Sequence, residues 1–222
     1  MADININRIE YIKKLIKEGQ TKTLWDAFVR RIYSEEVCFV FKRDLNIEIK
    51  KPRSLVKVTT RVSQEIDEAY FKENEKDGLM DQLETCYVAI NKDEIPCFRV
   101  WLIDASQNEK LQNIWKDTFP HLNKDEILLE NIFTVPQFRG MGIMATAMDI
   151  MADKCKELGA NYAITIVHVD DTNIIRSLNY VGFEPYQLRT RKWILFNKSI
   201  TFEEIPNNLM EQYHKATNRK YK

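Results

Sequence analysis

The residues with the clearest chemical potential form the stretch V-P-Q-F-R-G-M-G-I-M-A at 135–145, between a hydrophobic run and an amphipathic run. Gly140 and Gly142 have no Cβ, so successive main-chain N–H groups can face one anion at the positive end of the following helix. Arg139 can add a charged contact. Pro136 cannot donate to a sheet hydrogen bond, so it ends or bulges the preceding strand and leaves an edge for a ligand. The pattern predicts a pyrophosphate-binding turn.

A dinucleotide-binding turn is the alternative, because Gly140-x-Gly142-x-x-Ala145 also fits G-x-G-x-x-A. In that motif the first glycine follows the strand directly, whereas residues 136–139 intervene here. The acidic residue expected about 20 positions further on is also missing, and the first acid is Asp170. The alternative stays open and is disfavoured.

Strands and helices alternate around this turn. The pattern predicts a strand at 127–135, a helix at 142–159, a strand at 162–169 and a helix at 172–182, and both helices end at glycine. Apolar runs at 86–90 and 97–103 predict a hairpin upstream. The other expected elements are helices at 4–17, 23–33, 64–83 (in part), 111–115 and from 206, strands at 35–45, 54–62 and 191–196, and an exposed charged loop at 46–53.

The composition excludes several classes of protein. The 33 basic and 33 acidic residues balance, so no global field favours nucleic acid or an anionic membrane. The N-terminus lacks an apolar signal region and no run of about 18 apolar residues occurs, which predicts a cytoplasmic protein with no membrane partner. The four cysteines show no C-x-x-C pair, so we expect buried thiols and no metal site.

Two motifs resemble the GNAT (GCN5-related N-acetyltransferase) superfamily. Gln137-Phe138-Arg139-Gly140-Met141-Gly142 is similar to its Q/R-x-x-G-x-G/A signature, whose turn holds the coenzyme A pyrophosphate. The stretch from Asp171 to Phe183 resembles the later N-x-x-A/S…Y-x-x-x-G-F helix of the same family. Two motifs in this order, with a strand between them, are more specific than either alone.

The resemblance implies an α/β (α+β) fold with a mixed central sheet that is splayed in a V near Thr134 to Pro136 and flanked by helices. The chain would form one acyltransferase domain over 1–222, with a divergent helical and strand extension at 1–83 and the acyl-CoA-binding core at 84–197. The coenzyme arm would lie at the splay. The expected cofactor-binding residues are Phe133, Thr134, Val135, Gln137, Phe138, Arg139, Gly140, Met141, Gly142, Ile143 and Asn173.

The expected chemistry is direct transfer of an acyl group to an amine, which needs a base, an acid and a donor to the developing oxyanion. Glu130 is the expected base, placed on the face of Ile132 and Thr134, and the N–H of Val135 is the expected donor. The tyrosine that many family members use as general acid corresponds to Leu178. Tyr180 is the nearest phenol, although two helical residues differ by about 200°.

The resemblance therefore implies an N-acyltransferase that uses acetyl-CoA or another acyl-CoA as co-substrate. Its acceptor would be a small-molecule amine, and an amino sugar is one candidate. The resemblance is also compatible with a homodimer. A non-catalytic coenzyme A-binding module is the rival function, since the usual tyrosine is missing. His168 ends the strand at 162–169 where functional groups often lie, but a structural role is the simpler expectation for it.

Overall fold

The computed structural model describes residues 21–72, 83 and 85–217, so the helix expected at 4–17 lies outside the described residues. Contacts divide the described chain into two units. The smaller comprises residues up to Val37 together with Thr190–Thr201, and the larger comprises Cys38–Arg189 and the residues from Phe202 onward.

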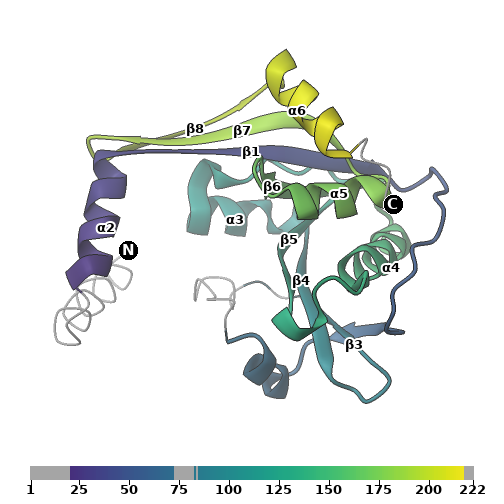
Figure 1. Cartoon of the computed structure of the whole chain (residues 1–222). Coiled ribbons are helices and arrows are strands. Elements are labelled where there is room, and N and C mark those ends of the chain that lie inside the picture. The colour runs from purple at the N-terminus through teal and green to yellow at the C-terminus, as the bar shows by residue number, and fades with distance from the viewer. Residues whose placement is uncertain (1–20, 73–82, 84, 218–222) are drawn as a thin grey trace. The chain divides into compact units, whose positions relative to one another are not determined.

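A mixed sheet is the main element of the fold, with strand order β2-β3-β4-β5-β6-β1-β7-β8. The strands are β1 (Tyr33–Asp44), β2 (Thr59–Val62), β3 (Cys86–Ile90), β4 (Pro96–Asp104), β5 (Glu126–Thr134), β6 (Tyr162–His168), β7 (Glu184–Ile194) and β8 (Asn197–Glu203). The helices are α2 (Thr21–Ile32), α3 (Asn108–Trp115), α4 (Ile143–Glu157), α5 (Thr172–Tyr180) and α6 (Asn207–Thr217), and short 3-10 turns lie between them (Figure 1).

Most of the expected elements are confirmed, including the hairpin of β3 and β4 and the order β5, α4, β6, α5. Two expectations are wrong. The strand expected at 54–62 begins only at Thr59, because residues 54–58 run outside the sheet. The strand expected at 191–196 is the end of β7, which stops at Ile194, where Leu195 and Phe196 turn the chain with positive φ into β8.

Strand β1 lies in the middle of the sheet order, although it comes from the region expected as an extension. It pairs antiparallel with β6 from Cys38↔His168 to Asp44↔Tyr162. Phe39, Val40 and Phe41 are all fully buried. A continuous apolar run is what a strand covered on both faces requires, so C-F-V-F fits this central position.

The V-shaped opening lies between β5 and β6. These parallel strands pair only from Glu126↔Tyr162 to Leu128↔Ile164, so they separate earlier than the expected position near Thr134. A β-bulge accompanies the separation, because Trp101 faces Glu130 whereas Arg99 faces Phe133. Two residues of β5 thus oppose one of β4. Asn131 takes the positive φ of 53° within the bulge.

A core of apolar side chains on one face of the sheet holds the larger unit together. It consists of Val40, Leu83, Trp101, Ile103, Leu111, Leu122, Leu128 and Ile164. Each such side chain contributes about 1.5–3 kcal/mol on burial. Because Leu111 belongs to α3, this helix covers that face. On the opposite face α4 contacts β4, β5 and β6.

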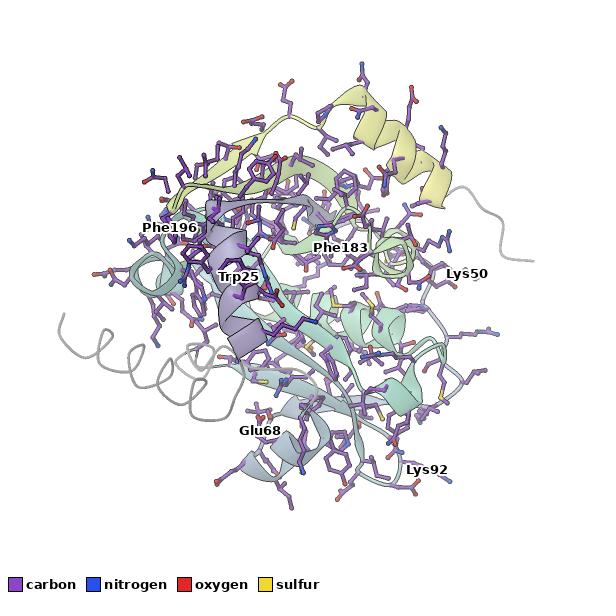
Figure 2. All side chains as sticks on the ribbon, turned by 60° about the vertical axis from the view of Figure 1, so that its left-hand side comes forward. Trp25, Lys50, Glu68, Lys92, Phe183 and Phe196 are labelled. Atoms are coloured by element: carbon purple, nitrogen blue, oxygen red, sulfur yellow. The ribbon has the colours of Figure 1, made fainter. Side chains whose placement is uncertain are left out.

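The smaller unit joins α2 to the ends of three strands. The N–H groups of Leu195 and Phe196 donate to the carbonyls of Ile32 and Arg31 at 2.8 and 2.7 Å. Phe28 packs against the rings of Trp25 and Phe196, which are labelled in Figure 2. Trp25 and Phe196 are both more than half exposed.

Candidate active site

The turn after β5 has the backbone that its sequence predicts. Pro136–Phe138 form a single 3-10 turn, and Arg139 is extended. Gly140 and Gly142 have φ of 76° and 75°, and Gly142 is the N-cap of α4. Left-handed φ at two positions explains why both are glycine. The first turn of α4 contains no acidic residue, so no side chain there offsets the positive end of the helix dipole.

The main-chain N–H groups of this turn fall into two sets. Those of Phe138 and Arg139 donate within the turn, to the carbonyls of Val135 (2.9 Å) and Pro136 (3.1 Å). Among residues 21–72, 83 and 85–217, none accepts a hydrogen bond from the N–H groups at 140–142. A helix also leaves its first N–H groups unsatisfied. The anion-binding capacity of the turn therefore lies in residues 140–143.

At the open edge of β5, the N–H of Val135 does not have the role expected for it as an oxyanion donor. The N–H of Val135 donates to the carbonyl of Cys97 at 2.9 Å, so it is not available as an oxyanion donor. Neighbouring residues of a strand direct their main-chain groups to opposite edges, which leaves those of Thr134 at the splay. Arg139 Nε donates to the carbonyl of Thr134 at 3.1 Å, so the guanidinium lies beside this open edge.

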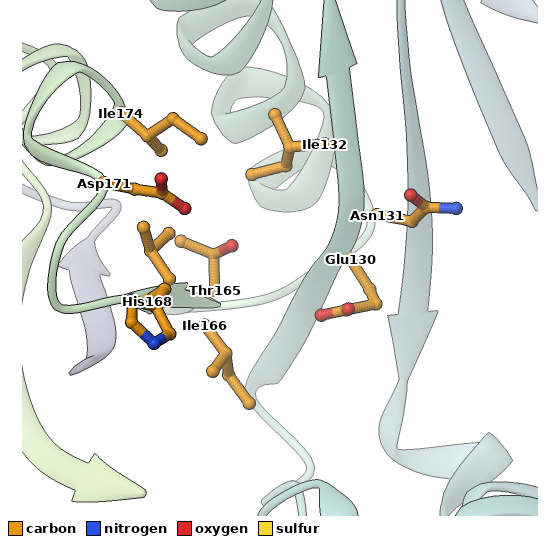
Figure 3. A pocket seen from close by; sticks show the side chains of 9 residues that line it. Glu130, Asn131, Ile132, Thr165, Ile166, His168, Asp171 and Ile174 are labelled. Atoms are coloured by element: carbon orange, nitrogen blue, oxygen red, sulfur yellow. The ribbon is translucent and has the colours of Figure 1, made fainter. Parts of the chain in front are cut away.

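A cavity of about 180 Å³ occupies the splay (Figure 3). It is lined by Glu130, Asn131, Ile132, Thr165, Ile166, Val167, His168, Asp171 and Ile174. The carboxylate of Glu130, the ring of His168 and the carboxylate of Asp171 supply its charged and titratable groups. Of the β6 residues that line it, the sequence singled out His168 alone, with a structural role as the simpler expectation. Thr165, a polar residue inside an apolar run, was a further usable signal.

The bulge changes the face on which Glu130 lies. Residues directly opposite each other on paired strands share a face, so Glu130 lies with Trp101 and Phe133 with Arg99. Trp101 and Arg99 are two apart and also share a face. Glu130 and Phe133 are therefore on the same face, and the expected grouping of Glu130 with Ile132 and Thr134 is wrong.

The cavity consequently joins the two faces of the sheet. Ile164, Ile166 and His168 alternate with Thr165 along β6, and the pairing Leu128↔Ile164 places them on the face of Glu130. Figure 3 shows Glu130, Ile166 and His168 on one side of β6 and Ile132, Thr165, Asp171 and Ile174 on the other. The second side is the one that α5 lines.

The ring of His168 contacts Asp170 through Nδ1. The N–H of Asp170 donates to His168 Nδ1 at 3.3 Å, and Asp170 Oδ2 lies 3.6 Å from the same nitrogen. Because Nδ1 accepts, the proton of a neutral imidazole lies on Nε2, which then donates. The ring remains about two-fifths exposed and open to a ligand.

The comparisons with known proteins agree with this geometry. The model of the Acetyltransferase (GNAT) family matches residues 63–183, which is more than half of the chain. The chain belongs to the GNAT acetyltransferase family. Members of this family use acyl-CoA, so the turn and the splay are the expected features of a coenzyme site. None of the curated proteins compared with the chain matches it.

Solved structures with low sequence identity share the GNAT fold. One is a GCN5-related glucosamine N-acetyltransferase region in a fungal multi-domain GH3 β-N-acetylglucosaminidase, with a TM-score of 0.55, 12% identity, and coverage of 78% of this chain and 23% of that one. Another is a Drosophila protein, with a TM-score of 0.52, 11% identity, and coverage of 81% and 58%. The chain thus spans about a quarter and somewhat over half of their lengths.

The predicted residues of the GNAT helix α5 lie in different surroundings. Leu178, at the position of the frequent tyrosine, is fully buried. Tyr180 is half exposed and does not line the cavity, so its role as general acid stays a prediction. Asn173 is exposed, and its carbonyl accepts from Ser177 Oγ at 3.0 Å. Asp171, two residues earlier, is the residue that lines the cavity.

The remaining predicted residues of the turn surround it. Phe133, Val135 and Phe138 pack in one small apolar cluster with Phe71, whereas Gln137 is exposed and Ile143 is buried. This cluster packs at the base of the turn, and a Cβ added to Gly140 would meet nothing within 4 Å.

Two buried cysteine thiols keep their protons at neutral pH. Burial raises the pKa of Cys97 to about 11 and that of Cys155 to about 12, so both thiols are protonated at neutral pH. In the described part of the chain, no three His, Cys, Asp or Glu side chains cluster to hold a metal ion. No described helix is long and apolar enough to cross a membrane.

Proposed function

We propose that this chain transfers an acetyl group from acetyl-CoA to the amine of a small molecule. The observation that supports this most is the continuity of the site, because the anion-binding turn at 140–143 follows directly on the strand whose splay opens a cavity beside Glu130. A coenzyme bound with its pyrophosphate at the turn can extend its arm along the open edge of β5 into that cavity.

The size of the cavity supports a short acyl group. Its volume of about 180 Å³ is below the roughly 300–1,000 Å³ of pockets that enclose drug-sized ligands. Ile132, Ile166 and Ile174 limit it with apolar side chains. Such a space suits a thioester with an acetyl group better than one with a long chain.

Glu130 is the proposed base, and it accepts the proton that the amine loses when its nitrogen attacks the thioester carbon. The amine forms the new C–N bond, the C–S bond breaks, and the sulfur leaves as a thiolate that takes up a proton. His168 lies on the same face, and its Nε2–H can donate toward charge that develops in the cavity. Tyr180 remains the alternative proton donor.

An amino sugar is the acceptor class that we favour. The structure with the highest TM-score given above includes a glucosamine N-acetyltransferase region by its description, although it shows likeness of fold alone. The acceptor would enter on the face of Glu130 and His168, opposite α4 and α5, where carboxylate and imidazole groups can bind hydroxyl and amine groups.

Two measurements test this function in sequence. Acetyl-CoA at about 100 times its Kd should stabilise the protein by about 2.7 kcal/mol, seen as a higher Tm, and Gly140→Glu should abolish the gain because a carboxylate would occupy the anion site. Release of free thiol is then followed with glucosamine and with other small amines. Absence of stabilisation by any acyl-CoA would contradict the proposal.

A non-catalytic coenzyme A-binding module is the second candidate, and one observation favours it. The side chain at the usual position of the acid is Leu178, which is buried. The two candidates differ in the thiol-release assay, provided that binding has been shown first. A protein that binds acetyl-CoA and releases no thiol with any amine would support the module.

A further inference from the structure

The segment at residues 45–58 connects β1 to β2 and runs beside α4, from the last turn of the helix to its first (Figure 1). At the last turn Lys156 Nζ donates to the carbonyl of Leu45 at 3.1 Å. At mid-helix Lys51 Nζ lies 3.2 Å from a carboxylate oxygen of Asp149. We call this segment the α4 strap.

The α4 strap ends against the phosphate-binding turn. The N–H of Leu55 donates to the carbonyl of Met141 at 2.9 Å. A Cβ added to Gly142 would lie 2.8 Å from the carbonyl oxygen of Arg53 and 3.3 Å from the Cα of Ser54. The main chain at 53–55 is therefore fixed in contact with the turn, and it is supported by the ion pair of Lys51 further along the helix.

The strap carries two cations at or close to its contact with the turn, one within residues 53–55 and one two residues further on. Arg53 and Lys57 are both exposed, and within the described residues neither forms an ion pair. Lys51, by contrast, is engaged by Asp149 and also by Asp153 at 2.7 Å. Coenzyme A has anionic groups at its pyrophosphate and at its 3′-phosphate. Long cationic side chains next to a main-chain anion site complement such a ligand.

We propose that Arg53 and Lys57 bind phosphate groups of the nucleotide half of coenzyme A, which makes the α4 strap a part of the cofactor site. The strap lies outside residues 63–183, the part of the chain that the family model matches. The inference rests on the proposed function. The contacts of the main chain at 53–55 with the turn distinguish Arg53 from a merely solvated cation, and Lys57 follows this segment by two residues.

Calorimetric titration of the full chain with coenzyme A and with 3′-dephospho-coenzyme A tests this. Arg53→Ala and Lys57→Ala should each weaken binding of coenzyme A about threefold, and the double variant about tenfold, at low ionic strength. The effect should shrink as salt is added. If the variants lose affinity for coenzyme A alone, the cations bind the 3′-phosphate. If they lose affinity equally for both ligands, the cations bind the pyrophosphate. Either result supports the proposal.

Two controls make the test specific. Lys124→Ala removes an exposed lysine just before β5, at the end of that strand opposite the turn, and should leave the affinity unchanged. The pair Arg53→Lys with Lys57→Arg keeps both charges and should retain binding. Wild-type affinity and salt dependence in the double alanine variant would overturn the inference and leave the proposed function intact. Failure of the unaltered protein to bind coenzyme A would instead reject the proposed function.

Discussion

The carbonyl oxygen of Arg53 lies 2.8 Å from the point at which a Cβ on Gly142 would stand. Residues far apart in the sequence thus meet at the turn that the family uses for coenzyme A. Gly142 satisfies two demands at once, a left-handed φ of 75° and the close approach of a second main chain. The motif glycine therefore has a structural role in this chain, in addition to the proposed role in binding coenzyme A.

Three glycine substitutions separate these demands. Gly140→Ala and Gly159→Ala each place a Cβ in open space at positive φ, so each should destabilise the protein by about 1–2 kcal/mol. Gly142→Ala adds a clash with main chain and should cost about 1–3 kcal/mol more. Urea unfolding measures the stabilities, and thermal shift with acetyl-CoA measures binding, which Gly159→Ala should leave intact. Equal stability of the three variants would contradict the packing of Arg53 on Gly142.

Replacement of Glu130 tests the base. Glu130→Gln keeps the size of the side chain and removes its proton-accepting carboxylate, so kcat should fall by about 100-fold or more while binding of acetyl-CoA is retained. Tyr180→Phe is the companion variant. Because Tyr180 is half exposed and does not line the cavity, we expect the kcat of the Tyr180→Phe variant to differ from that of the unaltered protein by less than about twofold. The opposite pattern would assign the essential proton transfer to Tyr180.

Replacement of Asp149 tests how α4 is held. Its carboxylate accepts from Arg43 Nη2 at 3.0 Å, and both side chains are almost fully buried. Asp149→Asn leaves the Arg43 charge buried without its partner, which should cost about 3 kcal/mol in the free energy of unfolding. Asp153→Asn is the matched control, since its pair with Lys51 is exposed and should matter by less than about 1 kcal/mol. Similar losses in the free energy of unfolding for the two variants would contradict the larger contribution assigned to the buried pair of Arg43 and Asp149.

The sequence predicted the local features of this site well. A helix start with two glycines needs only neighbouring residues, so the turn at 140–142 followed from residue types and their order. The central place of β1 was not predicted, because the pairing of Phe39 with Val167 joins residues that are distant in the chain. The uninterrupted apolar run C-F-V-F was the available signal, since a strand buried on one face alternates.

The face of Glu130 could not be predicted for a different reason. Simple alternation along β5 holds only until the bulge, and a bulge depends on how β4 and β5 pair. The contact of the α4 strap with Gly142 likewise depends on tertiary packing, because N-I-E-I-K-K-P-R indicates only a charged loop. Both features decide which side chains lie at the splay and at the turn, so the placement of the site residues was less predictable than the fold.

The pH dependence of stability gives a last prediction, at Asp67 in the 3-10 turn Glu65–Tyr70. Burial by itself would raise the pKa of this carboxyl, but hydrogen bonds from Arg61 (2.7 and 2.8 Å) and from the N–H of Gln64 (2.7 Å) outweigh it and lower the pKa below 3.8. A lowered folded pKa means that the stabilisation is fully present above 3.8 and is lost as the pH falls through the folded value.

Asp67→Asn should therefore reduce the free energy of unfolding by about 2 kcal/mol at neutral pH, because charged hydrogen bonds to Arg61 are lost. The difference from the unaltered protein should shrink when urea unfolding is repeated at about pH 3. Glu65→Gln, an exposed carboxyl of the same turn, is the control and should change stability little at either pH. A difference for Asp67→Asn that stays constant down to about pH 3 would mean that the charge of Asp67 contributes nothing, since only a charge-dependent interaction is lost on protonation.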